Sequence, residues 1–174
     1  LALSVIALAC ALTGLGGWLT AAPAYGAAAL HAARQAGWAP LATRRRPILW
    51  ILHLSHAWIP LGFVLRGLAA FGILNAPAAL HAFAVGAISG TIVGMITRTA
   101  LGHTGRPLAA GGAETAAYVL IFAAALLRVA AALIAAAYLP LLVASAALWS
   151  AAFAVYFIAY APHLARPRLD GKPG

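Results

Sequence analysis

The chain has 174 residues, of which 65% are hydrophobic and only 7% are charged, and its formal net charge is +9. Soluble domains carry about 25% charged residues, so this composition excludes a globular protein with a solvated surface. The positive charge does not indicate nucleic-acid binding, because the basic residues lie between apolar runs rather than along one face. The single cysteine, Cys10, excludes a disulfide framework and a multi-cysteine metal site within the chain.

Six apolar runs are candidate membrane spans, each of which needs about 20 mainly apolar residues. We therefore predict an all-α fold, a polytopic transmembrane helix bundle of about six helices over residues 1–165, with a polar cytoplasmic tail at 166–174. The predicted helices are 1–13, 20–35, 47–71, 77–101, 113–138 and 140–163. The first looks truncated and the second is short. Because residue 1 is Leu and the only methionine is Met95, we expect a fragment or a lost start.

Glycine and proline mark the boundaries between these runs. A glycine-rich turn at 14–17 ends the first run, and Pro23 suits the first turn of the second. Pro60 lies inside the third run, which it should kink. Asn75-Ala76-Pro77 starts the fourth run, and Leu139-Pro140 forms the turn into the sixth.

Basic residues follow the second, fourth and sixth predicted helices. They are Arg34, Arg44, Arg45 and Arg46; Arg98 and Arg106; and Arg166, Arg168 and Lys172. With six helices, all three groups fall on one side of the membrane, while the turns near Gly16, Asn75 and Pro140 carry no Lys or Arg. This positive-inside pattern predicts cytoplasmic basic loops and a cytoplasmic C-terminus.

Four histidines are candidate metal ligands: His53, His56, His81 and His103. His53 and His56 share a face of the third helix, roughly 9 and 14 Å in from the basic side. Neutral imidazole is a common ligand of haem iron and copper, and the alternative is a hydrogen-bonded core histidine. His81 and His103 are too far apart to bind one metal, roughly 30 Å along a helix. His103 can approach His53, and His81 can approach His56 only if the helices tilt or kink.

Arginine inside the bilayer is the second anomaly. Arg128 lies roughly 21 Å deeper than Glu114, so these two cannot pair, whereas Glu114 is placed to meet Arg98. Arg66 lies near a helix end and can snorkel to the interface. An unpaired intramembrane charge costs several kcal/mol. We expect a haem propionate, a bound anion or an acid outside this chain to neutralise Arg128; the alternative is a water-filled cavity or bonds to helix carbonyls.

Two further patterns indicate packing rather than chemistry. Gly86, Gly90 and Gly94 form a small-xxx-small repeat that lets another helix approach closely, and His81 faces a different neighbour. An aromatic stripe on the sixth helix suits a core or interface role better than a cofactor site. Its members are Trp149, Phe153, Tyr156, Tyr160 and His163. We favour a structural role for His163 and also for His31, near the end of the second helix.

The sequence contains no paired carboxylates, phosphate-cradling loop or serine triad, so the catalytic residues are unknown and an enzymatic role is left open. Residues 102–106, Gly-His-Thr-Gly-Arg, superficially offer backbone donors for an anion. They lack the lysine and the strand of a nucleotide-binding loop.

The run HAFAVGAISGTIVGMITRTALGHTGRPL, residues 81–108, closely resembles the signature of the NnrS family. The runs RRPILWILH, residues 45–53, and WIPLG, residues 58–62, are similar to that family as well. The resemblance extends over roughly residues 44–108, and LGHTGRP is its most specific part.

The resemblance implies a bacterial inner-membrane protein of about twelve helices that contains haem and copper. It also implies a link to the nitric oxide response, often beside denitrification functions, and a match of this chain to the C-terminal half of the family. The missing half or a second copy is then an expected partner, together with the lipid bilayer. By resemblance, the positions most worth testing are His53, His81, Arg98, His103 and Arg106. His56 lies where the family is not expected to require histidine.

Three hypotheses follow. The first is a membrane protein that binds haem and copper through these histidines, with Arg98, Arg106 and Arg128 as cofactor-binding residues, and that acts on or senses nitric oxide. The second is half of a small-anion transporter or channel, with Arg128 lining the pathway. The third is a structural module with no cofactor.

Overall fold

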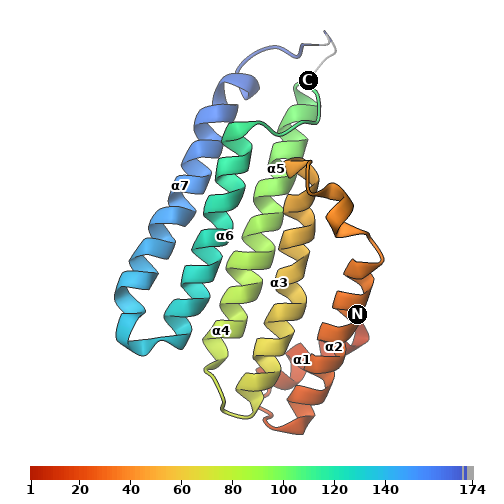
Figure 1. Cartoon of the computed structure of the whole chain (residues 1–174), viewed down its shortest axis with the longest axis vertical. Coiled ribbons are helices and arrows are strands. Elements are labelled where there is room, and N and C mark those ends of the chain that lie inside the picture. The colour runs from red at the N-terminus through yellow and green to blue at the C-terminus, as the bar shows by residue number, and fades with distance from the viewer. Residues whose placement is uncertain (170, 172–174) are drawn as a thin grey trace.

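The computed structural model describes residues 1–169 and 171, and this part of the chain is a bundle of helices (Figure 1). The elements are α1 (Ala2–Leu12), α2 (Trp18–Ala36), the 3-10 helix η1 (Pro40–Thr43), α3 (Pro47–Ala70), α4 (Ala76–His81), the π-helix η2 (Ala82–Ser89), α5 (Gly90–His103), α6 (Gly112–Leu133), the 3-10 helix η3 (Ala135–Ala137) and α7 (Tyr138–Leu164). Because α4, η2 and α5 follow one another without a break, the bundle has six main helical segments. The predicted all-α bundle of about six helices is confirmed.

Four segments are long and apolar enough to cross a membrane, which indicates a multi-pass membrane protein. They are Pro47–Ala70, Ala76–His103, Gly112–Leu133 and Ala135–Leu164. The first two predicted spans form α1 and α2 but are not among these four. The 11 residues of α1 cover only about 16 Å, and α2 carries polar residues such as Thr20, His31 and Arg34.

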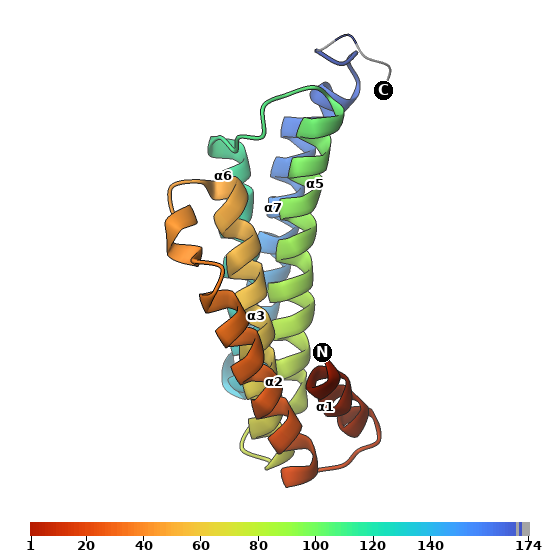
Figure 2. The same ribbon diagram turned by 90° about the vertical axis from the view of Figure 1, so that its right-hand side faces the viewer.

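The basic segments gather at one end of the bundle, which we call the basic end. The α2–α3 connection, the α5–α6 connection and the chain after α7 all lie toward the top of Figure 1. The α1–α2, α3–α4 and α6–α7 turns lie toward the bottom, at what we call the opposite end. α1 and α2 lie against the lower part of α3, as the side view in Figure 2 shows. The charge pattern along the sequence therefore corresponds to a physical polarity of the bundle.

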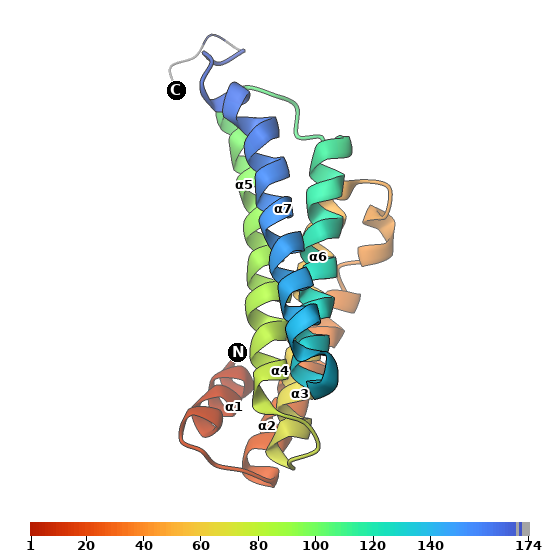
Figure 3. The same ribbon diagram turned by 90° about the vertical axis from the view of Figure 1, so that its left-hand side faces the viewer.

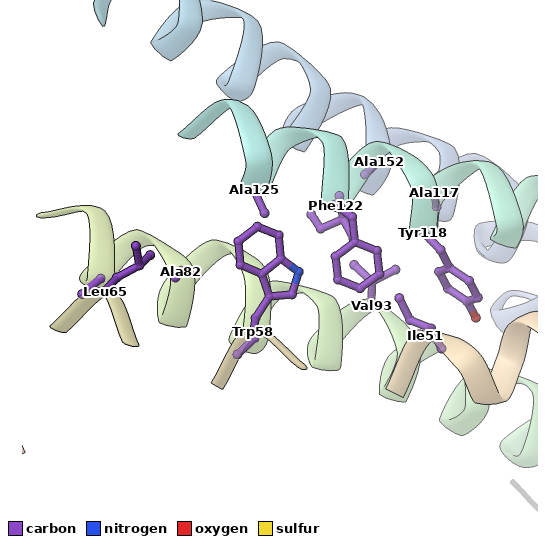
Figure 4. Packing of buried hydrophobic residues seen from close by; sticks show 13 residues of the cluster. Ile51, Trp58, Leu65, Ala82, Val93, Ala117, Tyr118, Phe122, Ala125 and Ala152 are labelled. Atoms are coloured by element: carbon purple, nitrogen blue, oxygen red, sulfur yellow. The ribbon is translucent and has the colours of Figure 1, made fainter. Parts of the chain in front are cut away.

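The glycine repeat packs the fourth apolar run directly onto α3. A methyl group added at any of the three glycines would meet an α3 side chain. The facing pairs are Gly86 with Trp58, Gly90 with Ser55 and Gly94 with Ile51. Replacing glycine would force the two backbones apart, so the repeat has the packing role expected from its spacing. Trp58 points from α3 toward α6, where it lies beside Ala125 (Figure 4).

The aromatic stripe of α7 joins this helix to its neighbours by hydrogen bonds. Figure 3 shows α7 beside α5 and α6. The bonds run from Trp149 Nε1 to Ser89 Oγ (3.2 Å), from Tyr156 OH to Ile96 O (3.4 Å) and from Tyr160 OH to Glu114 Oε1 (2.8 Å). The stripe thus contributes to the packing between helices, in agreement with the structural interpretation.

The turn between the last two helices differs from the predicted boundaries. The predicted helix 113–138 ends at Leu133, and α7 begins at Tyr138 rather than at residue 140. Pro140 therefore lies in the first turn of α7, where a missing N–H costs nothing because that group has no intrahelical partner. In α3 the helix continues through Pro60 to Ala70.

Candidate cofactor site

Three histidines meet where α2 packs against α3. His53 and His56 lie on α3, and the antiparallel α2 brings His31 beside them. The ring centroids of His31 and His56 are 5.4 Å apart. Trp38, in the connection after α2, lies 4.7 Å from the ring of His56 and 6.2 Å from that of His53. We call His31, His53, His56 and Trp38 the hairpin cluster.

Local hydrogen bonds hold the hairpin cluster in place. Gln35 Nε2 donates to the backbone carbonyl of His53 at 2.8 Å and fastens the end of α2 to α3. Ser4 Oγ of α1 lies 3.1 Å from His31 Nε2, within hydrogen-bond distance. The guanidinium of Arg34 lies over the Trp38 ring, 5.4 Å from its centroid, and this cation–π contact positions the indole.

Each histidine of the hairpin cluster keeps one buried ring nitrogen without a hydrogen-bond partner in the described structure. These atoms are His31 Nδ1, His53 Nδ1 and His56 Nε2. Buried polar atoms are nearly always paired, so three unpaired nitrogens in one cluster need an explanation. A neutral imidazole nitrogen without a partner is a metal-ligand atom or the site of a hydrogen bond to a bound group.

Two pockets adjoin the hairpin cluster. His53 lines a pocket of about 480 Å³ together with Arg44 and Trp50. His31 lines a smaller pocket of about 100 Å³ together with Ser4 and Arg34. The larger volume suits an organic group, and the smaller one suits an ion or a few waters.

The donor set fits haem more directly than copper. Within residues 1–169 and 171, no three His, Cys, Asp or Glu side chains are grouped so as to hold a metal ion. Haem iron requires only one or two axial protein ligands, which the hairpin cluster can supply. For copper, the described part of the chain offers the His31–His56 pair rather than a set of three or four ligands.

His81 and Arg128 meet at the opposite end, away from the hairpin cluster. They line a pocket of about 650 Å³ between α4, α6 and the start of α7, together with Asn75 and Tyr138. Asn75 Nδ2 donates to the carbonyl of Ala132 and so ties the α3–α4 turn to α6. Arg128 Nη1 is buried and has no hydrogen-bond partner in the described structure. His81 therefore approaches Arg128, not His56.

The remaining predicted residues lie at the basic end. His103, in the last turn of α5, is exposed and lines a pocket with Thr99 and with Leu164 of α7, so it does not join His53. Arg98 is half-buried on α5, and Arg106 lies just beyond that helix. The assignment of these residues to a cofactor stays a prediction.

The LGHTGRP motif forms the C-terminal cap of α5. Gly105 has the left-handed φ of 68°, and its N–H donates to the Gly102 carbonyl at 3.2 Å. The Arg106 N–H donates to the Leu101 carbonyl at 2.9 Å, which completes a Schellman motif, and Pro107 prevents the helix from continuing. These backbone donors are already used, so they do not form the superficial anion site suggested by the sequence.

Glu114 does not pair with Arg98 as predicted. Its Oε2 accepts from the backbone N–H of Gly111 at 2.8 Å, and its Oε1 accepts from Tyr160 OH at 2.8 Å. The carboxylate thus caps the N-terminus of α6 and joins that end to α7.

Sequence reasoning assigned a structural role to His31 and did not place it in the site. The missed signal is the hairpin symmetry about the α2–α3 connection. His31 lies five residues before the end of α2, and His53 lies six residues after the start of α3. Two antiparallel helices joined by a short connection bring such positions to similar depths.

A comparison with protein-family models matches residues 1–168 to the family described as NnrS protein. The chain belongs to the NnrS family. The match extends well beyond the motif-bearing residues 44–108 and includes both α2 and α7. A search of curated proteins and a search of solved structures found no match.

Proposed function

We propose that this NnrS-family protein binds haem in the hairpin cluster and takes part in nitric oxide metabolism or the nitrosative stress response. Membership of the family supports the link to nitric oxide. The observation that carries the cofactor proposal is the set of three unpartnered buried imidazole nitrogens beside a pocket of about 480 Å³. The location we propose is a bacterial inner membrane, with the basic end in the cytoplasm.

In this proposal the residues of the hairpin cluster have separate tasks. His53 lines the larger pocket and supplies an axial ligand, while Arg44 in the same lining pairs with a propionate. Trp50 and Trp38 cover the histidines and exclude water. When bound, haem supplies an iron atom on which a diatomic gas can be held or converted.

Copper is the second proposed cofactor, and the His31–His56 pair is its proposed location. The small pocket beside His31 has room for an ion, and Ser4 adds a hydroxyl. Since this chain supplies few ligands there, the proposal includes ligands from a second copy or a missing half.

An absorption spectrum joined to a metal analysis tests the haem proposal. Wild-type protein, produced with haem and copper supplied, should show a Soret band that is lost or shifted in His53→Ala. His163→Ala is the matched control, because it removes a half-buried histidine of α7 outside the hairpin cluster. His81→Ala and His103→Ala test the other predicted ligands. A wild-type protein without a haem band, or a His53→Ala spectrum identical to the wild type, would contradict the proposal.

Anion transport is the alternative function, and it rests on Arg128. The residues that line the Arg128 pocket come from the α3–α4 and α6–α7 turns and the adjoining helix ends, all at the opposite end. A transport route needs access to both ends of the bundle. Anion flux into liposomes that disappears with Arg128→Leu would favour transport over haem binding.

A further inference from the structure

Arg128 is a cation inside an apolar pocket at a defined depth. It lies five residues before the end of α6, so its Cα is roughly 8 Å from that helix end along the axis. Residues at such a depth reach the boundary between lipid headgroups and acyl chains. The pocket lining contains no acidic side chain among the described residues. A buried guanidinium nitrogen without a partner at this depth needs an anionic group from outside the chain.

The shape and lining of the pocket narrow the class of ligand. Its volume of about 650 Å³ is far larger than a small inorganic anion requires. Apart from Arg128, His81, Asn75 and Tyr138, its walls are alanine, leucine and proline. The ligand therefore combines an anionic oxygen group with an apolar body.

A second cavity on the other side of α4 repeats the arrangement. Arg66 lies about four residues before the end of α3, and its Nε is buried without a partner in the described structure. It lines a pocket of about 470 Å³ whose other walls are apolar, including Leu8 of α1 and Phe83 of η2. Leu80 and Pro77 of α4 belong to both cavities. Two arginines at similar depths, each in an apolar pocket, fit a ligand that surrounds the whole bundle.

We propose that the opposite end of the bundle binds the phosphate group of an anionic phospholipid through Arg128, with the apolar walls of the pocket holding the glycerol and upper acyl region. The guanidinium forms paired hydrogen bonds with phosphate oxygens, and His81 and Tyr138 are further donors in the same lining. The bilayer supplies this ligand at all times. The site is independent of the hairpin cluster and does not require haem.

Lipid retention during purification tests this proposal. Wild type, Arg128→Gln and Arg45→Gln are exchanged into detergent with phosphatidylglycerol or phosphatidylcholine, and native mass spectrometry measures bound lipid. Arg45 is the matched control, an exposed arginine at the basic end. We expect wild type and Arg45→Gln to retain phosphatidylglycerol, and Arg128→Gln to retain about tenfold less, as the loss of one charge-assisted contact implies.

Two further arms keep the result decisive. Arg128→Lys keeps the charge without the planar fork, so it should fold and retain an intermediate amount of lipid. A thermal shift with inorganic phosphate equal to that with phosphatidylglycerol would overturn the proposal in favour of a free anion. Equal lipid retention by wild type and both Arg128 variants would also overturn it. So would a loss of haem in Arg128→Gln with unchanged lipid, which would assign the pocket to a propionate.

Discussion

At the scale of single residues, the family motif has a clear conformational task. Gly105 adopts a φ of 68°, which L side chains rarely tolerate, and the backbone bonds of Gly105 and Arg106 close the end of α5. The Thr104 hydroxyl adds a bond of 2.7 Å to the Ala100 carbonyl. Much of the specificity of LGHTGRP therefore lies in ending a helix at a defined residue rather than in contacting a ligand.

Gly105→Ala should lower the free energy of unfolding by about 1–2 kcal/mol, because a Cβ in the left-handed region clashes with the following carbonyl. Denaturant unfolding in detergent measures the effect. Gly102→Ala is the control, since a Cβ there meets no atom within 4 Å and alanine favours the helix. An equal loss in both variants would argue against the cap.

Tyr160→Phe should destabilise the protein by about 1.5–3 kcal/mol, the usual contribution of a hydrogen bond to a charged group. Tyr160 is buried, and its hydroxyl donates to Glu114 at 2.8 Å. Tyr156→Phe, which loses a longer bond of 3.4 Å to a backbone carbonyl, should cost less. The same unfolding assay decides the order, and a double-mutant cycle with Glu114→Gln should show coupling between the two side chains.

At the scale of elements, the closest packing lies between α3 and the continuous helix of α4, η2 and α5. Glycines on one helix receive larger side chains from the other, so each backbone approaches the side chains of its neighbour. Gly62 of α3 receives Phe83 in the same way that Gly86 receives Trp58. Gly67 likewise lies against Tyr25 and joins α2 to α3. These contacts fix the positions from which α3 presents the hairpin cluster.

Gly86→Ala should cost about 1–3 kcal/mol, as expected for overpacking of a close interface. The new methyl group would overlap the Trp58 ring, which is buried between α3 and α6 and has little freedom to move. Gly94→Ala should cost less, because its nearest neighbours are aliphatic side-chain atoms at 3.2 Å. Thermal unfolding of both variants gives the comparison, and a larger loss for Gly94→Ala would contradict this account.

At the scale of the whole molecule, the bundle has one end rich in arginine and one end nearly free of it. The three basic segments lie together at the basic end in Figure 1. This asymmetry is the signal that orients multi-pass proteins during insertion. The two ends also differ in content, because the hairpin cluster lies toward the basic end and the Arg128 pocket lies at the opposite end.

Labelling with a membrane-impermeant thiol reagent tests the orientation. In a Cys10→Ala background, Leu41→Cys reports on the basic end and Ile73→Cys on the opposite end; both native side chains are exposed. In intact cells the reagent should label Ile73→Cys alone, and after permeabilisation it should label both. Labelling of Leu41→Cys in intact cells would reverse the proposed topology.

Periodicity and charge were sufficient to predict the helices, their approximate bounds and the gathering of arginines at one end. These features depend on local composition and on the thickness of a bilayer, both of which are visible in a single chain. The glycine repeat was interpretable for the same reason, since its spacing alone places it on one face. The resemblance of residues 44–108 also identified the family, which the match over residues 1–168 confirms.

Only the tertiary structure decided which polar side chains meet. It brought His31 into contact with His56, separated His103 from His53 and placed His81 with Arg128. It also gave Glu114 to Tyr160 rather than to Arg98. Spacing along one helix fixes depth and face, but the choice of neighbour depends on how close the backbones come. In this protein that distance is set by glycines and large side chains on different helices, a relation that no single helix contains.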